Sequence, residues 1–171
     1  MIELQKKIQK TSRFTANTFR FIMIFPLGGM LVNIIALAGL LLGNEAIAQQ
    51  LILEAPQAGT LQVIVFLMGS TAVLTLAAYC LLLAQRIFRE ISEEYTPFRP
   101  VHVQRMRSIA LISIVCILGQ ALMEAWSLQL KGGSFAVDLN LAYFLIPLVV
   151  CSFSFILDYA CQLQAEADTT L

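Results

Sequence analysis

The chain has 171 residues, of which 58% are hydrophobic and only 13% charged, and its eleven basic and eleven acidic residues cancel at pH 7. Globular domains usually contain about 45–50% apolar and about 25% charged residues. This composition excludes a disordered tail, a secreted disulfide-rich scaffold and a nucleic-acid-binding domain. We therefore expect a membrane protein with several spans, whose surroundings are the lipid bilayer.

Four charge-poor runs are long enough to cross a bilayer. A helix needs about 20 mainly apolar residues to cross a hydrocarbon core of ~30 Å, because every backbone polar group must be bonded within it. The predicted spans cover residues 21–43, 61–84, 109–127 and 139–158. The expected fold class is all-α, an integral four-transmembrane-helix bundle that forms one domain over residues 1–171.

The basic residues predict the orientation. Ten of the eleven either precede the first predicted span or lie in residues 85–108, between the second and third spans. Short loops rich in Lys and Arg stay in the cytoplasm, so we expect both termini and residues 85–108 to face the cytoplasm from an inner membrane. Ala46-Ile47-Ala48 resembles a signal-peptide cleavage site. The apolar run before it exceeds the ~7–15 residues of a signal peptide, and we interpret it as an uncleaved anchor.

The first connection, residues 43–60, is acidic and only mildly polar. Its Ile47, Leu51 and Ile52 are compatible with an amphipathic helix on the outer membrane surface, and equally with a connection packed on the bundle. The third connection contains Lys131-Gly132-Gly133-Ser134, a sequence typical of a turn.

Helix is predicted to continue beyond the second span, because Arg86/Glu90 and Arg89/Glu93 have the i,i+4 spacing of helical ion pairs. Pro97 then ends the helix, and Pro100 suits the first turn of the next one.

After this proline break, the predicted cytoplasmic loop is positively charged through Arg99, Arg105 and Arg107. One interpretation is a docking platform for a cytoplasmic protein. The other is a solvated basic loop held near anionic lipid, and the residues alone favour it.

The sequence contains no recognisable catalytic or cofactor-binding set. Cys80, Cys116 and Cys151 fall in predicted spans and Cys161 follows the fourth, without the close pairing of a thiol oxidoreductase, so we interpret them as small buried apolar residues. His102 is the one histidine, too few for a haem or metal bundle. We expect no enzymatic activity, no cofactor and no metal.

Helix packing is indicated by small residues. Gly39 and Gly43 form a GxxxG pattern in the first span, which allows a second helix to approach closely. The pattern does not say whether that helix belongs to the same chain or to a second copy, so a homo-oligomer remains open. Pro26, with Gly28-Gly29, and Pro147 are expected to distort their helices.

Two segments resemble a known family when they are considered together. One is Pro97-Phe98 with the residues that follow it, Val103, Arg107 and Ile109. The other lies at the C-terminus and comprises Leu163-Gln164, Glu166, Asp168 and Thr170. They resemble the bacterial four-span membrane proteins known as domain of unknown function 2975. The chain departs from that pattern at Arg99-Pro100, where the family's threonine would cap the next helix.

That resemblance implies a partner. The family has no established activity, and its members are often encoded beside a small helix-turn-helix regulator. The leading hypothesis is therefore a regulatory or sensory membrane protein that binds a cytoplasmic DNA-binding partner. Its candidate binding residues are Arg99, Arg105, Arg107, Glu166 and Asp168.

An internal repeat is also indicated. Residues 92–98 and 165–171 share Glu and Thr at a constant offset of 73, and both follow a span that runs inward. This favours two tandem helical hairpins in a parallel pseudo-repeat. The acidic tail, with Glu166 and Asp168, would then lie near Arg99, Arg105 or Arg107.

A second hypothesis is a small transport or immunity protein that acts on a peptide or lipid-like ligand through the bundle. It predicts that substitutions at Asn33, Gln120 or Glu124 change solute flux or toxin tolerance. Hydrogen bonds between helices explain the neutral polar residues within the spans, Asn33 and Gln120 among them, and solvation at the membrane interface is the favoured explanation of the Gln120–Glu124 pair.

Overall fold

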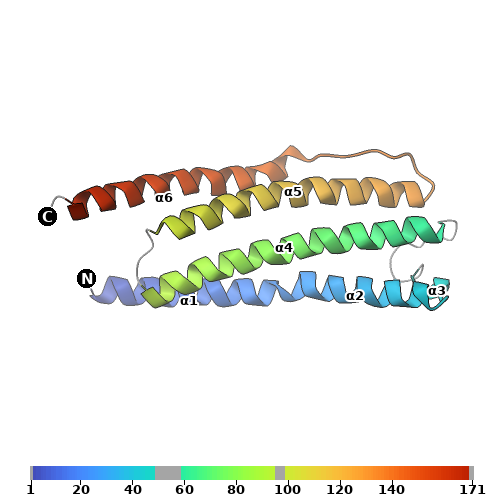
Figure 1. Cartoon of the computed structure of the whole chain (residues 1–171), viewed down its shortest axis with the longest axis horizontal. Helices are drawn as coiled ribbons and strands as arrows, with labels where there is room; N and C mark the ends of the chain where they lie inside the picture. The colour runs from blue at the N-terminus through green and yellow to red at the C-terminus, as the bar shows by residue number, and fades with distance from the viewer. Residues whose placement is uncertain (1, 49–58, 95–98, 170–171) are drawn as a thin grey trace. The chain divides into compact units, whose positions relative to one another are not determined.

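The described residues of the computed structural model are 2–48, 59–94 and 99–169, and within these ranges every regular element is a helix (Figure 1). The helices in chain order are α1 (Ile2–Ile22), α2 (Ile24–Leu41), α3 (Glu45–Ala48), α4 (Thr60–Glu94), α5 (Pro100–Leu130), the 3₁₀ helix η2 (Leu141–Phe144) and α6 (Leu145–Thr169).

Four stretches of these helices are long and apolar enough to cross a membrane: Lys6–Leu41, Thr60–Glu93, Pro100–Leu130 and Leu141–Ala167. This confirms the predicted all-helical chain with four candidate spans. Each stretch extends beyond its predicted span, because helix continues into the charged segments. Large apolar side chains are exposed on each, including Phe25 (73%), Met68 (62%), Leu111 (66%) and Ile146 (68%). Such surfaces are rare on soluble monomers and suit contact with lipid.

The two span prolines act near helix starts. Pro26 is the third residue of α2, and the helix is interrupted at Met23, between α1 and α2. A proline donates no backbone hydrogen bond and its ring clashes with the carbonyl four residues earlier, here that of Ile22. Pro147 is likewise the third residue of α6, directly after the 3₁₀ turn of η2. The predicted distortion is thus a helix break for Pro26, and for Pro147 a change of helix type.

Gly43 and Gly132 end their helices in the same way. Both have a left-handed backbone, with φ of 79° and 84°, which glycine adopts without steric cost. The Gly43 N–H donates to Leu40 O and the next N–H to Gly39 O, at 3.1 and 2.8 Å. Gly132 and the residue after it repeat this pattern at 3.0 Å each, on Gln129 O and Leu128 O. These are Schellman motifs, which satisfy carbonyls at a helix end.

The predicted turn at residues 131–134 is therefore present, and α5 begins at Pro100 as expected. The first connection contains the short helix α3, while Leu51 and Ile52 lie outside the described residues, as do Pro97 and Phe98.

The chain divides into two compact units. Unit 1 comprises Met1–Met23, Tyr79–Ile114 and Ala142–Leu171. The N-terminal end of α1 and the C-terminal end of α6 lie at the same end of this unit (Figure 1). Its sequence holds ten of the eleven basic residues and seven of the eleven acidic ones. Helix α1 packs on α4 through Phe19 and Phe88, whose rings stack with centroids 5.6 Å apart.

Unit 2 comprises Ile24–Ala78 and Val115–Leu141. Its core is formed by five buried apolar residues from three helices: Ala36, Leu40, Val63, Leu67 and Leu130. Close helix approach occurs at Gly29, Gly69 and Gly119. A Cβ added there would stand 3.0 Å from Leu74 Cδ1, 2.7 Å from Met123 Sδ and 2.8 Å from Val73 Cγ2, respectively.

Candidate functional site

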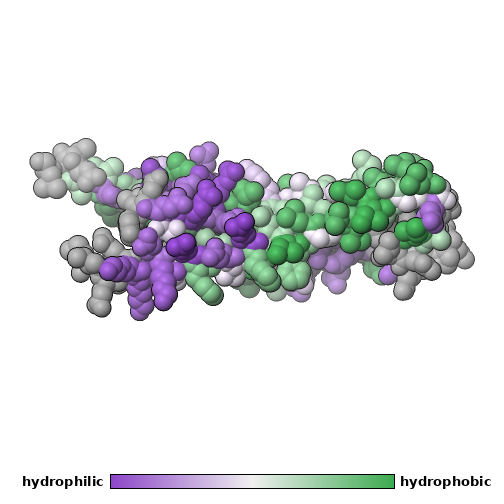
Figure 2. All heavy atoms as spheres, turned by 90° about the horizontal axis from the view of Figure 1, so that it is seen from below, coloured by the Kyte–Doolittle hydropathy of each residue, from purple (hydrophilic) through white to green (hydrophobic). Residues whose placement is uncertain are grey.

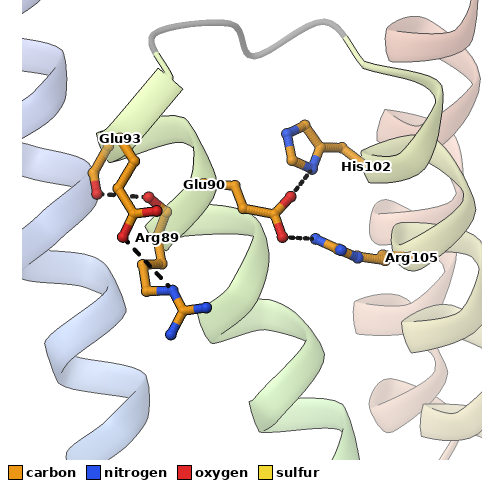
Figure 3. Close-up of polar contacts among 6 residues, drawn as sticks. Arg89, Glu90, Glu93, His102 and Arg105 are labelled. Atoms are coloured by element: carbon orange, nitrogen blue, oxygen red, sulfur yellow. Dashed lines mark hydrogen bonds and ion pairs between the residues drawn. The ribbon is translucent and has the colours of Figure 1, made fainter.

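The clearest polar cluster in unit 1 centres on Glu90 of α4. Figure 3 shows its carboxylate pointing toward α5, with one oxygen facing His102 and the other Arg105. Arg105 Nη1 lies 2.7 Å from Glu90 Oε1, and His102 Nδ1 lies 3.9 Å from Glu90 Oε2. The His102 side chain is almost wholly buried, at 1% exposure, while Glu90 and Arg105 retain 23% and 22%. This cluster joins α4 to α5 where both helices are charged.

The i,i+4 spacing predicted partners for Arg86 and Arg89 on α4 itself. Arg89 and Glu93 do form an ion pair, with Nε 3.8 Å from Oε1, and both side chains are more than half exposed. Glu90, expected opposite Arg86, directs its oxygens to the neighbouring helix α5 instead (Figure 3).

A second ion pair joins α5 to α6. Arg107 Nη2 donates to Asp158 Oδ2 at 2.7 Å, and the guanidinium carbon lies 5.4 Å from the centroid of the Phe155 ring. The side chains of Arg107 and Asp158 are 45% and 37% exposed. A cation over an aromatic face adds attraction to that of the ion pair. The acid that contacts Arg107 is therefore Asp158, within α6, rather than a residue of the predicted acidic tail.

The remaining candidate binding residues belong to unit 1, at the start of α5 and the end of α6. Arg99 is exposed directly before α5, and its carbonyl accepts a hydrogen bond from the His102 N–H at 2.9 Å. Glu166 is exposed on the last turns of α6. The backbone of Asp168 belongs to α6, but its side chain lies outside the described residues.

Within the described part of the chain, neither glycine of the GxxxG pattern faces a second candidate spanning helix, and contact with a helix of a second copy stays a prediction. Gly43 ends α2, and a Cβ added there meets no atom within 4 Å. At Gly39 an added Cβ would face Ile47 of the short helix α3, 3.6 Å from Cγ2. Tight contacts between candidate spanning helices of the chain lie at Gly29, Gly69 and Gly119.

A polar cleft of about 450 Å³ lies between α1 and α4 in unit 1, and we call it the α1–α4 cleft. From α1 it is lined by Gln9, Arg13, Ala16, Asn17 and Arg20. From α4 it is lined by Gln85, Arg89, Ser92 and Glu93. Each set follows the three- and four-residue spacing of one helical face. Sequence reasoning missed this cleft: the periodicity is visible in each segment, but nothing local shows that the two faces meet.

The polar residues of the spans are mostly bonded between or within helices. Asn33 is 8% exposed, and its Nδ2 donates to Ser70 Oγ at 2.9 Å and Thr71 Oγ1 at 3.2 Å, which joins α2 to α4. Gln120 donates to Glu124 at 3.2 Å on an exposed face of α5.

The four cysteines are free thiols and half-buried rather than fully buried. Cys80 Sγ lies 3.7 Å from Ile109 O, a contact between α4 and α5. Within the described ranges, no group of three or more His, Cys, Asp or Glu side chains is placed to hold a metal ion.

A scan against models of protein families, a search of curated proteins and a search of solved structures each gave no significant match to this chain.

Proposed function

We propose that this chain is a non-enzymatic, regulatory or sensory protein of a bacterial inner membrane, and that it binds a cytoplasmic partner through the charged end of unit 1. The observation that carries the proposal is the unequal distribution of charge between the units. Ten basic residues fall in unit 1 and only Lys131 falls in unit 2. Under the positive-inside rule, this distribution supports a cytoplasmic position for the ends of α1, α4, α5 and α6 that belong to unit 1.

Two ion pairs support a docking role for this end. Glu90–Arg105 and Arg107–Asp158 fix α5 against α4 and α6, at N–O distances of 2.7 Å each. A surface whose helices are already fixed loses less conformational freedom on binding, which favours affinity. Arg99 and Glu166 are exposed on the same unit and are the residues that we assign to direct partner contact.

The partner that we propose is a small DNA-binding regulator, as the family resemblance implies. We also propose the tandem hairpin repeat. The first helix of each hairpin, α2 or α5, ends in a Schellman motif, which supports it.

A transport or immunity role is the second candidate and has less support. It assigns ligand contact to Asn33, whose amide already bonds Ser70 and Thr71. A buried amide with two hydrogen-bond partners is explained by helix packing.

The first test is purification of the native-level protein in mild detergent, followed by mass spectrometry of the proteins bound to it. We expect a stoichiometric DNA-binding protein that is lost with Arg99→Glu and retained with Lys131→Glu, the matched reversal in unit 2. Arg105 and Arg107 are unsuitable single targets, because reversing them breaks the ion pairs within the unit. The Arg107→Asp/Asp158→Arg double variant restores the pair with its charges exchanged. No such protein, or equal retention by both reversals, would refute the proposal.

Orientation is tested separately with reporters fused after residue 171. A fluorescent protein that folds only in the cytoplasm should be bright there, and a phosphatase that is active only outside should be inactive. The opposite pair of results would contradict the cytoplasmic placement of unit 1.

A further inference from the structure

The α1–α4 cleft has the charge of an anion-binding site. Three arginines line it, Arg13, Arg20 and Arg89, against one acid, Glu93. Glu93 lies opposite Arg89 Nε at 3.8 Å. Among the described residues, Arg13 and Arg20 take part in no ion pair. Figure 2 shows hydrophilic side chains gathered over the surface formed by α1. Among the described side chains, the lining of the cleft therefore carries a net positive charge.

The donors in the cleft suit a phosphate group. A guanidinium presents a planar fork of N–H donors that matches phosphate oxygens two at a time. Gln9, Asn17 and Gln85 add neutral amides to the same walls. The volume, about 450 Å³, falls in the ~300–1,000 Å³ range of small-molecule sites.

Packing beneath the cleft holds its two walls in place. Ser12 and Ala16 of α1 are buried at 7% and 6% exposure, as is Ser92 of α4 at 8%. The Ser92 hydroxyl is turned to its own helix and donates to Arg89 O at 2.7 Å. The stacked rings of Phe19 and Phe88 join the same two helices. Small buried residues on both helices suit a close approach of α1 to α4.

The cleft also lies at the level where a lipid headgroup is expected. Arg20 directly precedes the first predicted span, and Gln85 directly follows the second. A smaller hollow of about 210 Å³ shares Gln85 and Arg89 with the cleft and is lined in addition by Arg86 and the apolar Leu82. The cationic walls thus adjoin apolar surface at the predicted membrane boundary.

We propose that the α1–α4 cleft is a binding site for a phosphate-bearing anion, held by Arg13, Arg20 and Arg89. Two sources share this chemistry, the headgroup of an anionic phospholipid and a soluble phosphate compound. The site is separate from Arg99, Arg105 and Arg107, so the proposal stands or falls independently of partner binding.

The test uses the full chain in neutral detergent with an equimolar mixture of phosphatidylglycerol and phosphatidylcholine, and native mass spectrometry to count bound lipid. We expect retention of phosphatidylglycerol over phosphatidylcholine, and at least a tenfold loss of phosphatidylglycerol affinity in Arg13→Gln or Arg20→Gln. Lys10→Gln is the matched control, since Lys10 is exposed on α1 but does not line the cleft. If the protein attracted anionic lipid only diffusely, Lys10→Gln would lower the phosphatidylglycerol affinity as much as Arg13→Gln or Arg20→Gln does.

Asn17→Ala gives a second variant that leaves net charge unchanged. It should weaken phosphatidylglycerol binding several-fold if the cleft holds the headgroup, and have no effect if attraction is diffuse. A melting curve of each variant in detergent shows that it is folded.

The soluble source is tested by titrating inorganic phosphate and pyrophosphate into lipid-free protein and measuring binding by calorimetry. Binding that Arg20→Gln abolishes and Lys10→Gln preserves supports the site with a soluble ligand. Equal effects of Arg20→Gln and Lys10→Gln on every probe, or no binding of any probe, would overturn the proposal.

Discussion

Gly119 of α5 lies so close to Val73 of α4 that a Cβ added at residue 119 would stand 2.8 Å from Val73 Cγ2. The neighbouring contact is its reverse, because Gly69 of α4 faces Met123 of α5, with Sδ 2.7 Å from an added Cβ. Each of the two helices therefore contributes one glycine and one larger side chain to the contact. Both contacts belong to unit 2.

These two contacts predict different responses to the same substitution. Valine is restricted to essentially one rotamer in a helix, whereas methionine has three rotatable side-chain bonds. Gly119→Ala should therefore lower the free energy of unfolding by about 1–2 kcal/mol, because overpacking outweighs the gain in helix propensity. Gly69→Ala should be neutral or stabilising by up to ~1 kcal/mol, since Met123 can move aside.

Denaturant unfolding in mixed micelles measures both variants. Val73→Ala in the Gly119→Ala background should restore stability, because it removes the methyl group that clashes. Equal losses for Gly69→Ala and Gly119→Ala would show that the rigidity of the facing side chain does not decide the outcome.

Glu90 and Glu93 lie on the same helix but should differ in their contribution to stability. Glu90→Gln removes the ion pair with the half-buried Arg105 and should cost about 1–2 kcal/mol in the free energy of unfolding. Glu93→Gln removes a pair at 3.8 Å whose side chains are 60% and 64% exposed, and should change stability by no more than ~0.5 kcal/mol. Thermal unfolding at fixed pH compares them, and a larger effect at Glu93 would contradict the assigned geometry.

The Arg107–Asp158 pair should contribute in a salt-dependent way. Its side chains are 45% and 37% exposed, so we expect Asp158→Asn to cost about 0.2–1 kcal/mol at low ionic strength. The Debye length falls from about 10 Å in 0.1 M salt to about 3 Å in 1 M, so the difference from the unsubstituted protein should shrink at high salt. A cost that is independent of salt would mean that Asp158 acts through packing rather than charge.

Asn33 should stabilise unit 2 through its two interhelical hydrogen bonds. Asn33→Ala is expected to cost about 1 kcal/mol, since hydrogen bonds between membrane helices average ~0.6 kcal/mol each. Ser70 and Thr71 keep their own bonds to Leu67 O, so their hydroxyls retain a partner in the variant. A double-mutant cycle with Ser70→Ala measures the coupling, and zero coupling would show that Asn33 acts independently of Ser70.

The sequence was sufficient for the features that depend on local chemistry. Runs of apolar residues identified the four candidate spans, and Pro100 identified the start of α5. Pro26 indicated a distortion, which the structure shows as the break at Met23.

Contacts between helices could not be obtained in the same way. Glu90 has Arg86 at helical spacing, yet it pairs with Arg105, because only the packed structure shows which partner lies across from it. The GxxxG pattern directed attention to Gly39 and Gly43, two glycines on one helix. At the α4–α5 contact each helix instead contributes one glycine, and such a pair is visible only when both helices are aligned.

The Schellman motif at Gly132 makes it practical to determine which side of the membrane the segment after it faces. The hydrogen bonds of this motif end helix α5, and the next helix, η2, begins only at Leu141. Every residue from 131 to 140, between the two, is exposed. A short epitope inserted after Ser134 should therefore leave both helices intact. An antibody added to spheroplasts, whose outer membrane is opened while the inner membrane stays intact, would then detect the inserted epitope only if this segment faces outward.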